Sequence, residues 1–154
     1  MTPLPERVTL TLTAVDIARI QIERAIQLFL DGEDYVSATT LAGAGEAILG
    51  DILRARDIKH ALDEIVDDSI LVGQKLYPKE VMTRKGIISL ANSYRDRLKH
   101  LNDGSDINVS VDYEAACMIE RACDNYAKVT GDETEIMDKF RMFEYFGPNA
   151  VDHA

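Results

Sequence analysis

The sequence of 154 residues has no Trp, only two Cys and four Pro, and few aromatic residues, at 6%. No stretch approaches the roughly 18 consecutive apolar residues of a membrane span, and the first residues lack the apolar core of a signal peptide. We therefore expect a cytoplasmic protein without membrane contact. The two thiols, Cys117 and Cys123, lie in one expected helix about 120° apart around its axis, so they should be reduced, packed thiols and cannot form a disulfide with each other. A chain of this length buries a core without disulfides or structural metal ions, and we predict no cofactor and no bound metal.

Basic residues are the scarcer charge, with 17 Lys and Arg against 27 Asp and Glu and a net charge of −10. This balance disfavours broad binding to nucleic acid or to anionic membranes, because both depend on neutralising many phosphates. The exception is the segment from Lys79 to His100, the basic strip, which holds six basic residues and two acidic ones. One local phosphate site therefore remains possible there.

Apolar residues recur at helical spacing through most of the chain and predict an all-α fold. Helices are expected over about 14–30, 34–56, 112–130 and 134–146, and from 78 or 83 to 101. The pattern over 57–77 is weaker and fits one bent helix or two short ones. With short connections, neighbouring helices should pack antiparallel as an up-and-down four-helix-type bundle with additional short helices. We expect an extended N-terminal arm at 1–12, a single bundle domain at 13–146 and a disordered tail at 147–154.

Local signals support several of these helix ends. Thr13 with Asp16 three residues later resembles a capping box. Gly32 can take the left-handed conformation that ends a helix, and Gly131 is placed to cap another. Gly43 and Gly45 stand in the middle of an expected helix, where glycine is unfavourable, so another element should approach closely there.

The basic strip contains the best candidate site. On a helical wheel its apolar stripe includes Leu90 and Tyr94, and none of Arg95, Asp96, Lys99 and His100 faces the core. A solvated face with a weak Asp96 to His100 pair explains this pattern. The same residues also allow chemistry, because imidazole transfers protons near neutral pH and guanidinium clamps phosphate. Arg95 and His100 diverge within one copy, so a shared cleft requires a homodimer in which two copies face across a two-fold axis.

The segment Arg95-Asp96-Arg97-Leu98-Lys99-His100 fits R-x-x-x-x-H with a polar residue after the arginine, and resembles the signature of the HEPN (higher eukaryotes and prokaryotes nucleotide-binding) superfamily. Residues 34–49 are similar to the second helix of that family. The resemblance implies a dimeric four-helix-type bundle acting as a metal-independent endoribonuclease or as an RNA-binding protein. It implies that His100 is the general base, that Arg95 stabilises charge on the phosphate, and that Asp96 orients the pair.

Other interpretations stay open. The same fold also serves as a non-catalytic dimeric interaction module, with a nucleotidyltransferase or another neighbour protein as partner. Some toxins of the family continue the motif as H-x-Y, whereas this chain has Leu101 and Asn102. Glu64 and Asp67 match half of the acidic signature of all-helical nucleotide pyrophosphatases. Asp57 with His60 falls short of the paired Glu-x-x-His motifs of a di-metal bundle, and His153 lies in the expected tail.

Overall fold

The computed structural model describes residues 6–100, 104 and 106–143. All the regular structure in these residues is helical, as the sequence predicts. The helices are α1 (Ala14–Leu30), α2 (Tyr35–Ala55), α3 (Ala61–Leu76), α4 (Arg84–His100), α5 (Val111–Thr130) and α6 (Glu135–Met142).

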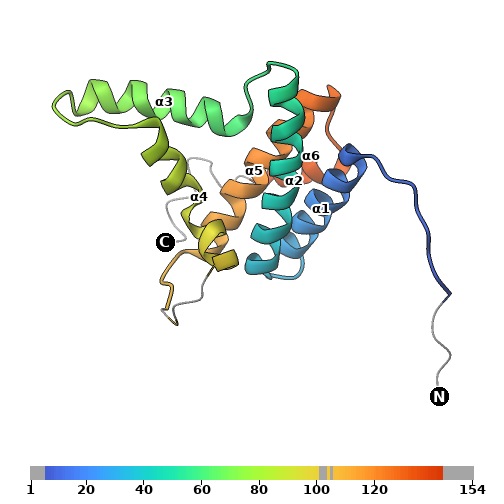
Figure 1. Cartoon of the computed structure of the whole chain (residues 1–154). Helices are drawn as coiled ribbons and strands as arrows, with labels where there is room; N and C mark the ends of the chain where they lie inside the picture. The colour runs from blue at the N-terminus through green and yellow to red at the C-terminus, as the bar shows by residue number, and fades with distance from the viewer. Residues whose placement is uncertain (1–5, 101–103, 105, 144–154) are drawn as a thin grey trace.

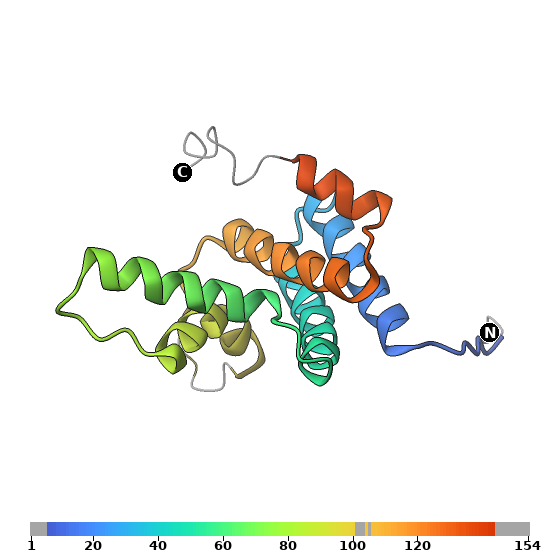
Figure 2. The same cartoon turned by 90° about the horizontal axis from the view of Figure 1, so that it is seen from above.

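Four helices form the body of the molecule. α2 packs along α5, α1 packs against both, and α6 closes the far side against α1 (Figures 1 and 2). Their inward faces supply the apolar core, in which Ile22, Ile26, Leu49 and Ile119 are fully buried. Burial of these side chains is the main stabilising term of the body.

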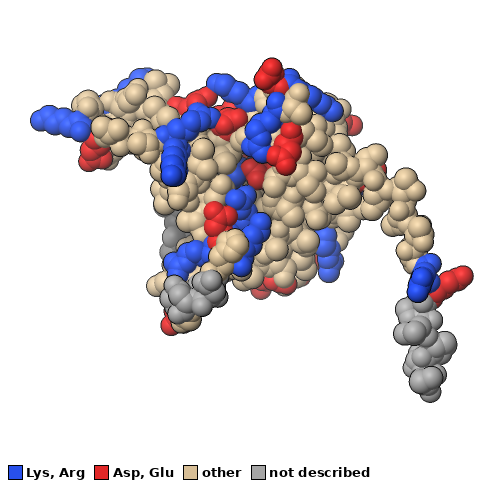
Figure 3. Space-filling view, viewed as in Figure 1, with Lys and Arg blue, Asp and Glu red and all other residues tan. Residues whose placement is uncertain are grey.

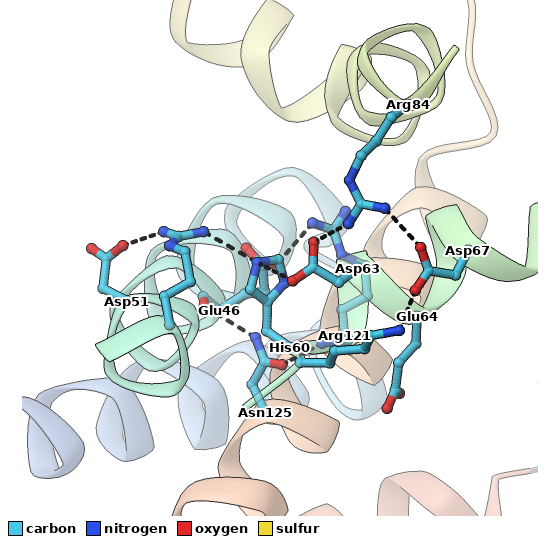
Figure 4. Close-up of polar contacts among 12 residues, drawn as sticks. Glu46, Asp51, His60, Asp63, Glu64, Asp67, Arg84, Arg121 and Asn125 are labelled. Atoms are coloured by element: carbon cyan, nitrogen blue, oxygen red, sulfur yellow. Dashed lines mark hydrogen bonds and ion pairs between the residues drawn. The ribbon is translucent and has the colours of Figure 1, made fainter. Parts of the chain in front are cut away.

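α3 and the first half of α4 project from the body and return on themselves, which we call the α3–α4 hairpin (Figures 1 and 2). Arg84 joins the two helices, because its guanidinium donates to Asp63 at 2.5 Å and to Asp67 at 2.7 Å (Figure 4). At the tip, Met82 lies on Gly73 so closely that a Cβ there would stand 1.9 Å from Sδ. Beyond the start of α3, which contacts α5, the hairpin is held by its own contacts. The second half of α4 reaches α2.

The structure resolves the uncertain helix boundaries. Residues 57–77 contain a single helix, α3, that starts after a turn in which Asp57 has a φ of 54°. α4 begins at Arg84, so the stretch from Pro78 to Thr83 is the connection. Residues 6–12 are exposed and carry no helix or strand. The expected tail at 147–154 and the segment 144–146 lie outside the described residues.

Two of the three predicted helix-end signals form as expected, and one differs. Thr13 and Asp16 form the predicted capping box, with the Asp16 amide donating to Thr13 Oγ1 at 3.1 Å. Gly131 caps α5 with a φ of 79°, as predicted. After α1 the left-handed residue is Glu33, with a φ of 49°, and not Gly32.

Among the described residues, none of the helices combines the length and the apolar content needed to cross a membrane.

Candidate functional site

A buried polar cluster lies where the second half of α4 meets α2 and α5. Arg121 from α5 donates through Nη2 to Glu46 Oε1 at 2.7 Å and through Nη1 to Asn92 Oδ1 at 3.0 Å. All three side chains are almost completely buried. A buried charge needs a partner of opposite charge and full hydrogen bonding, so Glu46 and Arg121 depend on each other. The cluster fixes the position of α4 on the body.

Arg95 lies at the edge of this cluster. Its Nη1 is 3.6 Å from Glu46 Oε2, and its side chain is only 17% exposed. A Cβ on Gly43 would lie 2.8 Å from Arg95 Cδ, so the glycine makes room for the arginine stem. The expectation that Arg95 points away from the body is therefore wrong for its side chain, because a long stem can fold inward from a flanking position of the helix.

Asp96 and His100 remain on the surface of α4. Asp96 Oδ1 accepts from Arg95 Nη2 at 3.0 Å and from Nε at 3.2 Å, so Asp96 contacts the arginine of the motif. Five residues along a helix separate Arg95 from His100 by about 140° around the axis and about 7.5 Å along it. The structure therefore brings Arg95 and Asp96 together, and places His100 more than one turn farther on, at the exposed end of α4.

Positive charge collects around this end of α4. Arg97, Lys99 and His100 occupy its last turn, close to the negative end of the helix dipole. In the view of Figure 3, Lys and Arg side chains form a column over α4, between the hairpin and the body. An anionic ligand approaching Arg95 would therefore meet a local field opposite in sign to that of the whole chain. Leu101 and Asn102, which follow the motif, lie outside the described residues.

The second histidine of interest, His60, is a buried residue at the start of α3 and not a surface ligand. Its Nε2 lies 3.1 Å from Arg54 Nη1 and 3.2 Å from Asp63 Oδ2, while Asn125 on α5 accepts from the backbone amide of Ala61 at 2.7 Å (Figure 4). Among residues 6–100, 104 and 106–143, no three His, Cys, Asp or Glu side chains lie together in a group that could hold a metal ion.

The carboxylates of the pyrophosphatase-like pattern are already paired with cations. Glu64 lies 2.7 Å from Lys128 Nζ, and Asp67 is bound by Lys59 at 2.5 Å and by Arg84 at 2.7 Å. Both cations lower the pKa of Asp67, because they donate hydrogen bonds to its charged form. These contacts give the carboxylates a structural role in fixing α3.

The thiols offer no activated nucleophile. Both are free, with Cys117 partly buried and Cys123 buried. Burial raises the pKa of Cys123 to about 12, so the reactive thiolate form is scarce at neutral pH. The predicted packing role of the cysteines is confirmed.

Sequence reasoning missed Asn92 and Arg121 as members of the cluster. A usable signal exists, because each charged member stands on an apolar helix face. Glu46 lies among the inward residues of α2 and Arg121 among those of α5. One acid and one base on the buried faces of two helices predict a buried ion pair, since neither charge is tolerated there alone.

Comparisons with models of protein families, with curated proteins and with solved structures give no match.

Proposed function

We propose that this protein is a HEPN-like, metal-independent endoribonuclease or RNA-binding protein of the cytoplasm, acting through Arg95 and His100. The observation that carries the proposal is the setting of Arg95. Its guanidinium is held at the rim of a buried cluster by Glu46, on the helix whose last turn carries Arg97, Lys99 and His100. An arginine placed in this way can bind phosphate oxygens bidentately without losing its support from the body.

The chemistry needs one base and one acid. A neutral His100 would take the proton of a ribose 2′-hydroxyl, whose oxygen then attacks the adjacent phosphorus. The P–O5′ bond breaks, and a protonated imidazole returns a proton to the leaving 5′ oxygen. Arg95 would stabilise the negative charge that develops on the phosphate, with Asp96 orienting its guanidinium. A homodimer would supply the second histidine, and the products would be a 2′,3′-cyclic phosphate and a 5′-hydroxyl.

The test is RNA cleavage in the presence of excess chelator. Wild type, His100→Ala and Arg95→Lys are compared, with Arg24→Ala as a control for loss of one exposed α1 cation outside the strip. We expect both site variants to lose cleavage by at least about a hundredfold and the control to retain it. General acid–base catalysis by His100 and electrostatic stabilisation by Arg95 each contribute that much or more. Equal cleavage by wild type and His100→Ala would disprove the nuclease proposal.

A second candidate function is a non-catalytic dimeric interaction module, paired with a nucleotidyltransferase or another neighbour protein. The observation that favours it is that two carboxylates, Glu46 and Asp96, already neutralise Arg95. Binding of a labelled single-stranded RNA by wild type and Arg95→Ala separates the two functions. Affinity that falls in the variant and weakens with salt supports an RNA site, whereas equally weak binding by both proteins supports the module.

A further inference from the structure

One side of α3 is exposed from Glu64 to Leu76, although it carries several large apolar side chains. Within about 140° of the helix circumference it carries four exposed hydrophobic side chains and three exposed charged ones, Glu64, Asp68 and Lys75. Ile65 is 40% exposed, Leu71 53%, Val72 52% and Leu76 66%, and Asp68 and Lys75 stand between them. This face also borders an open hollow of about 500 Å³, lined by residues that include Val72, Leu76 and Met82. Exposed apolar surface of this extent, rimmed by charge, is typical of an interaction site.

The positions of Asp68 and Lys75 are self-complementary, whereas Glu64, one turn before Asp68, is paired with Lys128 of the same chain. Asp68 and Lys75 are seven residues apart, so they lie about 10.5 Å from each other along the same line of the helix, with Leu71 and Val72 between them. Neither charged side chain forms an ion pair or hydrogen bond with any other residue that the structure describes. Reversing the direction of α3 exchanges the acid with the base and leaves the apolar pair in the centre.

We propose that this face binds the same face of a second copy, with two α3 helices antiparallel and a two-fold axis passing between Leu71 and Val72. In that arrangement Asp68 of each copy meets Lys75 of the other, and the hydrophobic residues pack at the axis. Such an interface is isologous, because each residue contact occurs twice. The seven-residue spacing also suits two helices packed at a shallow angle, about 8–10 Å apart. The projecting hairpin makes the face accessible to a partner (Figures 1 and 2).

This pairing concerns a surface apart from Arg95 and His100, so the homodimer that the nuclease proposal requires would form through a second, separate contact. The α3 pairing does not depend on whether that site cleaves RNA. The measurement is accordingly made without RNA. Failure of the nuclease experiment leaves the α3 pairing unaffected, and failure of the pairing leaves the role of Arg95 to be decided by RNA binding.

The test uses charge reversal on the full chain, followed by sedimentation equilibrium. Asp68→Lys alone brings two lysines together at both ends of the interface, and Lys75→Asp alone does the same with two aspartates. We expect each single variant to raise the dimer dissociation constant about tenfold or more, because two attractive pairs become repulsive. Asp138→Lys reverses an exposed charge on α6, on the other side of the molecule, and should leave the constant unchanged.

The decisive sample is an equimolar mixture of the two single variants. In a mixed dimer, the lysine introduced by Asp68→Lys faces the aspartate introduced by Lys75→Asp, and the unchanged Lys75 of the first chain faces the unchanged Asp68 of the second. Both pairs are attractive again, so the mixture should dimerise as wild type does. A disulfide formed between copies of Leu71→Cys, made with Cys117→Ser, gives an independent check on the position of the axis.

Three outcomes would overturn the pairing. The first is a wild-type chain that stays monomeric, and the second is a dimer that neither charge reversal weakens. The third is a monomer that captures a different protein on this face of α3.

Discussion

Substitution of Glu46 and substitution of Arg121 should lower the free energy of unfolding by unequal amounts, although the two residues form one ion pair. Glu46→Gln leaves the Arg121 guanidinium buried without a carboxylate, and its Nε already lacks a hydrogen-bond partner among the described residues. Removing one member of a buried pair costs about 3–5 kcal/mol of unfolding free energy. Arg121→Met instead leaves Glu46 with a second cation, Arg95, 3.6 Å away. Its cost should be smaller, about 1–3 kcal/mol.

The assay is urea unfolding, followed by circular dichroism at neutral pH, with thermal melting as a second measurement. For a chain of this size each kcal/mol corresponds to about 2–4 °C, so Glu46→Gln should lower the melting temperature by about 6–20 °C. Glu23→Gln is the matched control, because it removes the same charge from an i,i+4 pair with Arg19, in which the Arg19 and Glu23 side chains are 37% and 26% exposed. That pair should contribute less than about 1 kcal/mol.

A loss of unfolding free energy in Glu46→Gln no larger than that in Arg121→Met would contradict an ion pair as the basis of the cluster. That result would mean that Asn92 and water satisfy the arginine once the carboxylate is gone, so that the cluster is held by hydrogen bonding and not by charge. The double variant Glu46→Gln with Arg121→Met completes a thermodynamic cycle and measures the coupling between the two residues directly.

Three further predictions follow from particular contacts. Gly43→Ala should displace Arg95 and weaken RNA binding while the fold is retained, whereas Gly50→Ala, whose new Cβ would meet nothing closer than 3.8 Å, should be tolerated; binding assays and melting curves test both. The lowered pKa of Asp67 stabilises the folded state above its ordinary value of 3.8, so stability should fall as the pH drops below about 4, and Asp67→Asn should make unfolding less sensitive to acid over that range. Arg141→Met leaves three carboxylates of α5 and the α5–α6 connection close together without their cation, which favours proton uptake in the folded state, so this variant should gain stability as the pH falls from about 7 to about 5.

Local features of the fold could be predicted from the sequence because their causes are local. The capping box of Thr13 and Asp16 requires only three residues of spacing, and Gly131 supplies its own left-handed conformation. Gly43 and Gly45 correctly indicated close approach within α2. The atoms that approach Gly45 belong to Ala18 and Ile22 of the preceding helix, which is consistent with tight packing of neighbours.

The projection of the hairpin could not be predicted, because helical periodicity gives the apolar side of a helix but not what covers it. Leu90 belongs to the apolar stripe expected to face the core, yet it is 76% exposed because this part of α4 lies out on the hairpin. The position of the Arg95 side chain could not be predicted for a different reason. A wheel places Cα atoms, whereas the guanidinium is directed by Gly43 and Glu46, which are about fifty residues away in the sequence.

Glu46 lies at different distances from its two arginine partners, and this difference connects the fold to the proposed site. Glu46 holds Arg121 at 2.7 Å in full burial and Arg95 at 3.6 Å at the rim. If Arg95 turns to a phosphate, Arg121 still neutralises Glu46, so no buried charge is left alone. Asp96 is exposed and can release the guanidinium to solvent at little cost, since exposed ion pairs are weak. The cluster would therefore let Arg95 exchange carboxylate for phosphate while α4 stays fixed on the body, as the proposed RNA site requires.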